Sequence, residues 1–267
     1  MRKRNTQSRP SIPFGVLSTG ETVCFNLSAP SHIALQGMTR SGKSAAVYHF
    51  LASLTQCGVP VRVSMVDPTG VLGAPMESHS AAGSLSLGTQ DASSAVAVVD
   101  AVLADMHDRV SQLWNERTDK WTTWTPARPL HLLVVEEAPG LVEWLADEDA
   151  AEGRKTNQRL APRFVAGLRQ IMAQGLKVGV VVLVMAQRMD ASVISGPARS
   201  NIGIRICLRM DDPDGARMLF PGTDADVIAE LATALPGRGL VTTPDHRMEK
   251  VRLLHCDYSA YVSSFDT

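Results

Sequence analysis

The eight residues 37–44, GMTRSGKS, constrain this chain more than any other stretch, because they match the phosphate-binding pattern G-x-x-x-x-G-K-[ST]. The glycines let the backbone turn tightly around a phosphate, where a Cβ would collide. The backbone N–H groups then point inward and form a nest that binds anions. Lys43 can reach the β- and γ-phosphates of a nucleotide, and the Ser44 hydroxyl can ligate Mg²⁺. The predicted nucleotide-binding residues are Gly37, Met38, Thr39, Arg40, Ser41, Gly42, Lys43, Ser44 and Ala45.

The residues on either side of this loop support the same interpretation. Residues 31–36 are typical of a short buried strand, and apolar side chains recur at helical spacing over residues 47–54. A strand, a glycine-rich loop and a helix in this order place the helix N-terminus on the phosphates. The alternative is a chance match in a turn rich in glycine and serine. Such a match would need neither a strand before the loop nor a helix after it.

A second informative stretch is LHLLVVEE, residues 130–137, in which a buried apolar strand ends in two carboxylates. In proteins that hydrolyse nucleotides with such a loop, the first carboxylate holds the Mg²⁺ shell and the second polarises the attacking water as a general base. These roles fall to Glu136 and Glu137. Glu136 stands where aspartate is usual and is one methylene longer, so the metal shell must shift or include another water. The alternative is a pair of surface charges at a strand end.

The most apolar run, residues 178–186, predicts a central strand, and Gln187 and Arg188 follow it directly. In an open parallel sheet, polar residues at the carboxyl end of a central strand face the ligand crevice. Gln187 could therefore sense the γ-phosphate or orient water, and Arg188 could do the same or form an ion pair. Further strands are predicted at 21–27, 61–66, 202–208, 237–241 and 251–254, and helices at 99–114, 164–174 and 224–235. The pattern is that of an α/β fold with a mainly parallel central sheet flanked by helices.

Two polar segments interrupt these elements. Residues 68–93 are rich in glycine, serine and alanine and predict a long surface connection. Residues 146–163 predict a polar loop beside the active-site edge. A flexible loop that carries Arg154, Lys155 and Arg159 suits contact with the DNA backbone, and an ordinary solvated loop is the equal alternative.

Bulk properties narrow the class of protein. A net charge of -1 over 267 residues gives no global basic field, so DNA binding would need local patches or a ring that concentrates them. The four cysteines are far apart, without a C-x-x-C pair, and we expect reduced, mostly buried thiols. No apolar run is long enough to span a bilayer, and the N-terminus lacks the apolar region of a signal peptide. We therefore expect a cytoplasmic protein that reaches a membrane only through a partner.

The motifs, taken in order, resemble the motor domain of the FtsK/SpoIIIE family of DNA translocases. The set comprises the loop at 37–44, strands that end at Asp67-Pro68, at Glu136-Glu137 and at AQR 186–188, and the stretch SNIGIRI at 200–206. The loop alone is generic, whereas the ordered set is specific and covers roughly residues 20–256. Within the family, the stretch EEAPGL and the compact length are most similar to the Tra transfer proteins of actinomycete conjugative plasmids.

The resemblance implies a RecA-like P-loop fold that binds ATP and Mg²⁺ and drives double-stranded DNA through a ring-shaped homo-oligomer, a hexamer in the family. It also implies that a basic residue from the neighbouring subunit completes each site. Arg205 is our candidate for that residue, with Arg188 and Arg199 as rivals. The segment 147–159 falls where the family places a pore-facing loop, which favours contact with DNA.

The resemblance also sets the domain boundaries. We expect one motor domain over residues 21–257 and a short tail at 258–267. The first 20 residues are polar, basic and contain proline and glycine, so we expect a flexible arm. Three residues depart from the family pattern. Arg40 replaces a glycine, Glu136 replaces an aspartate, and Thr69 follows Asp67-Pro68 where lysine is common. The alternative function is an ATP-driven motor or switch for protein assembly or secretion, since type VII secretion ATPases share this motor type.

Overall fold

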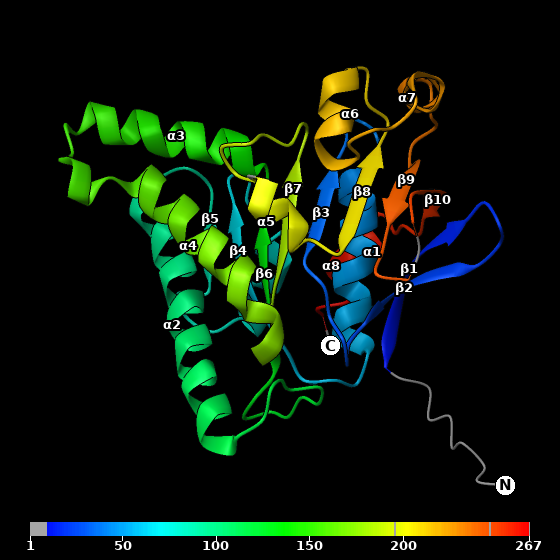
Figure 1. The fold of residues 1–267 in the computed structure, drawn as a ribbon. Helices are drawn as coiled ribbons and strands as arrows, with labels where there is room; N and C mark the ends of the chain where they lie inside the picture. Colours follow the sequence, from blue (N-terminus) through cyan, green and yellow to red (C-terminus); the bar gives the residue numbers. More distant parts are fainter. Residues whose placement is uncertain (1–9, 195, 246, 267) are drawn as a thin grey trace, which may run out of the picture.

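One large sheet organises the computed structural model, which describes residues 10–194, 196–245 and 247–266 (Figure 1). Within this part of the chain the sheet has ten strands in the order β2-β1-β10-β9-β8-β3-β7-β6-β4-β5. The six strands from β8 to β5 are parallel, and β9, β10, β1 and β2 extend them in antiparallel pairs. The strands are β1 (Ser11–Leu17), β2 (Thr22–Asn26), β3 (Ile33–Gln36), β4 (Val61–Asp67), β5 (Leu85–Leu87), β6 (Leu130–Val135), β7 (Val180–Ala186), β8 (Ile204–Leu208), β9 (Arg238–Thr242) and β10 (Glu249–Leu253).

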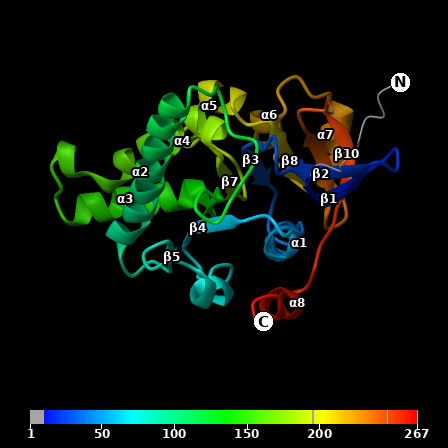
Figure 2. The same ribbon diagram turned by 90° about the horizontal axis from the view of Figure 1, so that it is seen from below.

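Helices cover both faces of this sheet, which explains why the central strands are apolar on both sides. In β6, Leu133 and Val135 belong to the core under α2 and α4, whereas Leu132 and Val134 belong to the core under α1. Figure 2 shows α1 and α8 on the face opposite α5 and α6. The helices are α1 (Lys43–Gln56), α2 (Ala92–Glu116), α3 (Ala138–Ala151), α4 (Leu160–Gln174), α5 (Gly196–Ser200), α6 (Pro213–Leu219), α7 (Ala225–Ala232) and α8 (Tyr258–Ser263). The predicted fold class is confirmed.

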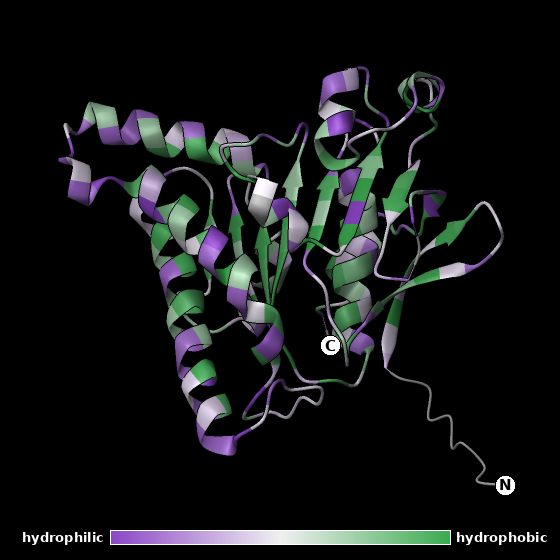
Figure 3. Ribbon diagram, in the orientation of Figure 1, coloured by the Kyte–Doolittle hydropathy of each residue, from purple (hydrophilic) through white to green (hydrophobic). Residues whose placement is uncertain are grey.

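Local signals explain where several helices begin. The carboxylates of Asp91, Asp212 and Asp257 accept backbone N–H groups at the first turns of α2, α6 and α8. Apolar residues concentrate on the strands and on the inner sides of the helices, as Figure 3 shows. No helix in the described segments is long and apolar enough to cross a membrane.

Both predicted chain ends are more ordered than expected. Residues 11–17 of the predicted arm form β1, which buries Ile12 and Phe14 and pairs with β2 and β10. The prediction of a flexible arm is therefore wrong for this part, and residues 1–9 lie outside the described segments. The predicted tail at 258–267 begins with α8, which buries Tyr261, and continues to the buried Phe265.

Two polar segments and the cysteines also differ from the prediction. The connection at 68–93 contains a 3₁₀ helix (Ala74–His79) and β5, which pairs with β4. The predicted loop at 146–163 is helical at both ends, because α3 continues to Ala151 and α4 begins at Leu160. The thiols are not mostly buried: Cys207 is buried, Cys24 is exposed, and Cys57 and Cys256 are partly exposed.

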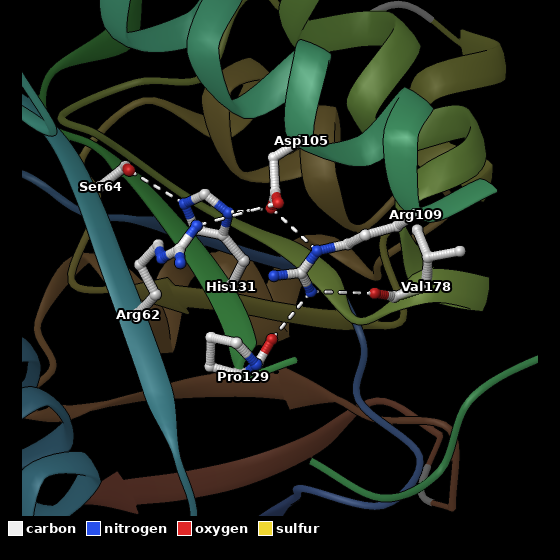
Figure 4. A network of polar contacts seen from close by, with 7 residues as sticks. All are labelled: Arg62, Ser64, Asp105, Arg109, Pro129, His131 and Val178. Carbon is white, nitrogen blue, oxygen red and sulfur yellow. Dashed lines mark hydrogen bonds and ion pairs between the residues drawn. The ribbon is translucent and has the colours of Figure 1, made fainter. Parts of the chain in front are cut away.

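A buried ionic network fastens α2 to the amino ends of the central strands (Figure 4). Arg109 Nε lies 2.9 Å from Asp105 Oδ2 within α2. Arg109 Nη1 donates to the carbonyls of Pro129 at 2.8 Å and Val178 at 3.2 Å, just before β6 and β7. One guanidinium therefore links a helix to the starts of two strands, and its Nε and Nη1 donors have partners although the side chain is buried.

The same network contains a serine, a histidine and an aspartate in the order of a catalytic triad. His131 Nδ1 lies 2.6 Å from Asp105 Oδ2, and His131 Nε2 lies 2.9 Å from Ser64 Oγ. Ser64 and His131 are buried, so no substrate reaches the hydroxyl. Burial lowers the pKa of His131, although Asp105 opposes this shift. The network is structural, with a neutral imidazole as its bridge.

Candidate nucleotide-binding site

The glycine-rich loop joins the end of β3 to the start of α1, as predicted. Gly42 has a φ of 96°, and a Cβ there would lie 2.6 Å from the backbone nitrogen of Gly237. A Cβ at Gly37 would lie 2.6 Å from Ser41 Oγ. Gly42 is therefore required by conformation and close packing, and Gly37 by close packing. Gly237 also donates its N–H to the Ser41 carbonyl at 2.7 Å, so the turn before β9 supports the loop.

The loop has the chemistry of a phosphate site. Ser41 Oγ is buried and has no hydrogen-bond partner among the described residues. The Lys43 ammonium donates to the Gly37 carbonyl within the loop. Burial lowers the pKa of Lys43, while the nearby carboxylates of Glu137 and Glu136 act to raise it. Because α1 begins at Lys43, the positive end of the α1 helix dipole also lies at the loop. The Ser41 hydroxyl, the Lys43 ammonium and this helix N-terminus together fit a phosphate.

Arg40 has an unusual backbone that explains the glycine of the family pattern. Its φ is 63°, in the left-handed region of backbone conformation that residues other than glycine rarely adopt. The side chain is exposed, and the Arg40 carbonyl accepts a hydrogen bond from Arg209 Nη2 at 3.3 Å. The Arg209 carbonyl also accepts the N–H of Met38 at 2.9 Å. Arg209, at the carboxyl end of β8, thus holds the loop at two points, and the sequence analysis missed this role.

Asp67, at the end of β4, is a fixed carboxylate beside the site. It is buried and accepts the backbone N–H groups of Thr69 at 2.9 Å, Leu72 at 2.8 Å and Gly73 at 3.0 Å. Burial acts to raise the pKa of Asp67, but hydrogen bonds from Glu136, Thr69 and Gly73 outweigh it and hold the pKa below its usual value. Asp67 is therefore ionised and cannot reorient freely.

Glu136 lies against this fixed carboxylate. Thr69 Oγ1 is 3.0 Å from Glu136 Oε2 and 2.8 Å from Asp67 Oδ1, so the hydroxyl lies between the two acids. Burial raises the pKa of Glu136 to about 8, and the hydrogen bond with Asp67 and its charge add to the shift. A cation would compensate for the two neighbouring acids, of which Asp67 is buried and Glu136 partly buried.

The residues present fit Mg²⁺ better than a metal held in an all-protein cage. Within the described segments, no group of three or more histidine, cysteine or acidic side chains has the arrangement of a metal site. Mg²⁺ keeps several waters and takes ligands from one or two carboxylates and from phosphates. Glu136 and the exposed hydroxyl of Ser44 are the groups that would hold it, beside the phosphate loop.

The structure brings Glu137 and Gln187 together. Glu137 Oε1 and Oε2 accept the backbone N–H of Gln187 at 3.1 Å and 3.0 Å. Glu137 also has a φ of 47° at the start of α3, which turns the chain sharply after β6. The contact uses the backbone of Gln187, and its side chain is exposed. A left-handed non-glycine residue at a strand end is a costly conformation of the kind that clusters at functional sites.

The three candidate arginines each contact groups outside the phosphate loop of their own chain. Arg205 pairs with Ala34 in the sheet, at the end of β8 opposite the loop, and Nη1 donates to the Leu219 carbonyl at 3.2 Å. Arg188 forms an ion pair with Asp212 at 2.8 Å. Arg199 donates to the Met218 carbonyl at 2.8 Å.

The candidate DNA-contact residues lie in the turn between α3 and α4. The turn begins after the 14 residues of α3, about 21 Å along its axis from Glu137, so the expected position beside the active-site edge is wrong. Arg154 forms ion pairs with Asp149 at 3.2 Å and Glu152 at 2.6 Å. Lys155 and Arg159 are exposed and form no ion pair within the described segments.

Gln36 is a second residue that the sequence analysis missed. It is buried at the end of β3, directly before the phosphate loop. Its Oε1 accepts the N–H of Met189 at 3.0 Å, and its Nε2 donates to the Gly215 carbonyl at 2.8 Å. The amide thus fixes the segment after β7, which carries Gln187, to α6. A polar residue at the end of an apolar strand was the available signal.

Comparisons with known proteins agree with this geometry. The chain is 23% identical over 268 residues to the DNA translocase FtsK of Chlorobaculum tepidum, covering 96% of this chain and 31% of that protein. It thus spans about a third of this curated relative. The FtsK/SpoIIIE family model matches residues 1–255.

Solved structures show the same fold at low sequence identity. The pCW3 conjugation coupling protein TcpA with ATPgS has a TM-score of 0.70 and 18% identity, over 95% of this chain and 68% of that one. The cytoplasmic domain of the type VII secretion ATPase EccC of Thermomonospora curvata has a TM-score of 0.69 and 18% identity, over 99% and 32%. EssC from Geobacillus thermodenitrificans has a TM-score of 0.66 and 13% identity, over 96% and 48%. The fold is that of P-loop ATPase motors, and with the family match over almost its whole length the chain belongs to the FtsK/SpoIIIE family.

Proposed function

We propose that this chain is an ATPase that translocates double-stranded DNA in conjugative or plasmid transfer or in chromosome segregation. The observation that carries the ATPase part is the carboxylate of Glu137, which the Gln187 N–H holds at the strand end beside the phosphate loop. The protein would work in the cytoplasm and would reach a membrane through a tethered partner protein.

In the proposed reaction, Lys43 binds the phosphates of ATP, and Ser44 and Glu136 hold Mg²⁺. Glu137 polarises the attacking water as general base, and the Gln187 side chain senses the γ-phosphate. The backbone N–H of Gln187, directly after β7, would keep the carboxylate of Glu137, two residues after the end of β6, oriented.

Two substitutions test these roles. Lys43→Ala should abolish ATP hydrolysis, because the cradle loses its cation. Glu137→Gln should keep ATP binding and lower turnover by roughly 10²- to 10⁴-fold, the usual contribution of a general base. Glu143→Gln, an exposed carboxylate farther along α3, is the matched control and should leave turnover unchanged. Turnover retained by Glu137→Gln would remove this residue from the role of base.

We further propose a ring-shaped homo-oligomer, a hexamer by analogy with the family, in which Arg205 completes the site of the neighbouring subunit. Arg205 lies at the end of β8 away from the phosphate loop of its own chain, which supports a role in another subunit. Burial lowers its pKa, and the charge of Arg199 adds to the shift, so a neighbouring anion would favour the charged guanidinium.

The DNA contacts in this proposal are Lys155 and Arg159, with Arg154 as a third contact once it leaves its carboxylate partners. The test is the ATPase rate with and without double-stranded DNA over a range of salt concentrations. Stimulation should fall steeply with salt if phosphate contacts carry it. The double variant Lys155→Ala/Arg159→Ala should lose most of the stimulation, whereas Lys120→Ala, which removes an exposed lysine outside the α3–α4 turn, should keep it.

The second candidate function is an ATP-driven motor or switch for protein assembly or secretion. The ion pairs of Arg154 with Asp149 and Glu152 favour it, because they neutralise one of three cations expected to bind DNA. The same ATPase assay separates the two candidates. An ATPase without any response to double-stranded DNA would overturn translocation and favour the assembly or secretion motor.

A further inference from the structure

The C-terminal helix α8 reaches a loop that lies far from it in sequence. Tyr261 is buried, and its hydroxyl donates to the Leu72 carbonyl at 2.7 Å. The Tyr258 hydroxyl donates to the Val71 carbonyl at 3.2 Å. Both carbonyls belong to the loop that follows β4, almost 190 residues earlier in the chain.

The two peptide units that the tyrosines hold are the ones that bind Asp67. The peptide between Val71 and Leu72 accepts from Tyr258 and donates its N–H to Asp67 Oδ2 at 2.8 Å. The peptide between Leu72 and Gly73 accepts from Tyr261 and donates its N–H to the same oxygen at 3.0 Å. Each peptide unit is therefore fixed at both ends, by a tyrosine hydroxyl and by one carboxylate oxygen.

This arrangement strengthens the hold on Asp67. A hydroxyl that donates to a peptide carbonyl polarises the peptide, so its N–H becomes a better donor. Asp67 in turn shares the Thr69 hydroxyl with Glu136, because Thr69 Oγ1 lies 2.8 Å from Asp67 Oδ1 and 3.0 Å from Glu136 Oε2. The chain of contacts thus runs from α8 through two peptide units to Asp67 and on to Glu136.

The helix is also anchored beside the phosphate loop. The rings of Tyr261 and Tyr48, in α1, are stacked at 4.8 Å with an interplanar angle of 19°. The N–H of Cys256, just before α8, donates to the Ala45 carbonyl at 3.2 Å, one residue after Ser44. α8 therefore links the two elements that carry Ser44 and Asp67.

We propose that Tyr261 and Tyr258 are positioning residues, which set Asp67 and through it the Mg²⁺ shell at Glu136. The inference rests on the proposed ATPase function, which assigns that shell to Glu136. It predicts that the tyrosine hydroxyls affect the use of Mg²⁺ and have little effect on the phosphate cradle.

The test compares Tyr261→Phe and Tyr258→Phe with Tyr48→Phe. All three remove one hydroxyl from the same ring cluster, but Tyr48 makes no hydrogen bond to the loop among the described residues. The first readout is amide hydrogen exchange of residues 68–76 in nucleotide-free protein, which should be faster in Tyr261→Phe and Tyr258→Phe. The second is the Mg²⁺ concentration that half-saturates the tight binding of a non-hydrolysable ATP analogue. It should rise roughly three- to tenfold in Tyr261→Phe, the factor expected for one buried hydrogen bond.

A smaller effect is expected for Tyr258→Phe, because Tyr258 is 42% exposed and its hydrogen bond is longer. This variant also keeps the inference testable if Tyr261→Phe fails to fold. Analogue affinity in EDTA should stay unchanged in both, which a general loss of structure would not allow. An unchanged Mg²⁺ requirement in both tyrosine variants would overturn the inference, as would equal effects in Tyr48→Phe. Wild-type protein that binds no nucleotide with Mg²⁺ would instead overturn the proposed function.

Discussion

The left-handed backbone at Arg40 allows the strain in the phosphate loop to be measured. An L-residue in this region costs roughly 1–2 kcal/mol, whereas glycine adopts it freely. Glycine also loses about 0.5–1 kcal/mol more conformational entropy on folding. With a φ of 63° at residue 40, Arg40→Gly should therefore stabilise the protein by about 0.5–1 kcal/mol. For a domain of this size the melting temperature should rise by about 1–4 °C.

Arg40→Ala separates this strain from the loss of the guanidinium, because alanine keeps the Cβ and loses the charge. The hydrogen bond from Arg209 to the carbonyl of residue 40 is available to both variants. We therefore expect only Arg40→Gly to gain stability in thermal and urea unfolding of nucleotide-free protein. ATP affinity should change equally in both variants if the guanidinium contacts phosphate. Equal stability of the glycine and alanine variants would refute the argument from backbone strain.

Three further predictions concern buried charge and the shared site. Arg109→Met should lower the free energy of unfolding in urea by roughly 3–5 kcal/mol, since it removes the buried guanidinium from Asp105 and leaves the carbonyls of Pro129 and Val178 without their donor. Arg128→Met, at a partly exposed ion pair with Glu116, should cost under about 1 kcal/mol. Burial lowers the pKa of His32 from 6.5 to about 4 in the folded protein. Between pH 6.5 and pH 4 the imidazole is therefore protonated in the unfolded chain and neutral in the folded one, so stability falls as the pH drops through this range. This group should contribute a loss of about 3 kcal/mol in urea unfolding, and His32→Asn should lack that slope. Arg205→Ala should bind ATP but lose roughly 10³-fold in turnover, and mixing it with Lys43→Ala should restore part of the rate.

The sequence could predict the parts of the fold whose signals are local. The phosphate loop, the apolar strands β6 and β7 and the carboxylates that follow β6 are each visible within about ten residues, and the structure has these elements at the predicted places. Strand β1 was missed because Pro10 and Pro13 favoured a loose arm, although it pairs with the adjacent β2. Its second partner, β10, is some 240 residues away and has no local signal. Helix α8 is similarly short, and only packing of Tyr261 against α1 and the loop after β4 explains its order.

The polar half of the site was also hidden for a physical reason. Gln36 and Arg209 act through backbone groups of segments that are distant in sequence, and no residue pattern encodes such partners. Asp67 accepts N–H groups of the loop directly after it, and that loop conformation has no simple sequence signature. The length of α3 was underestimated because its second half is acidic. In the structure one of these acids, Asp149, is buried and accepts the N–H groups of Leu160 and Ala161 at the start of α4. The role of Arg205 in another subunit stays a prediction, since it depends on a neighbouring chain.

The two departures from the family pattern beside the metal position lie next to each other. Glu136 is one methylene longer than the usual aspartate, and Thr69 replaces the usual lysine. In the structure the Thr69 hydroxyl lies 3.0 Å from Glu136 Oε2 and 2.8 Å from Asp67 Oδ1. An aspartate at position 136 would be too short to keep this hydrogen bond with the Thr69 hydroxyl. Residues 69 and 136 should therefore be energetically coupled.

A double-mutant cycle with Thr69→Val and Glu136→Asp measures that coupling. We expect the two substitutions together to cost about 0.5–1.5 kcal/mol less than the sum of the single ones, because either change alone already removes the shared hydrogen bond. The measurement is the free energy of unfolding in urea, without nucleotide or metal. Thr69 also donates its backbone N–H to Asp67, and valine keeps that contact. Additive costs would mean that the two departures arose independently, and that Thr69 serves Asp67 alone.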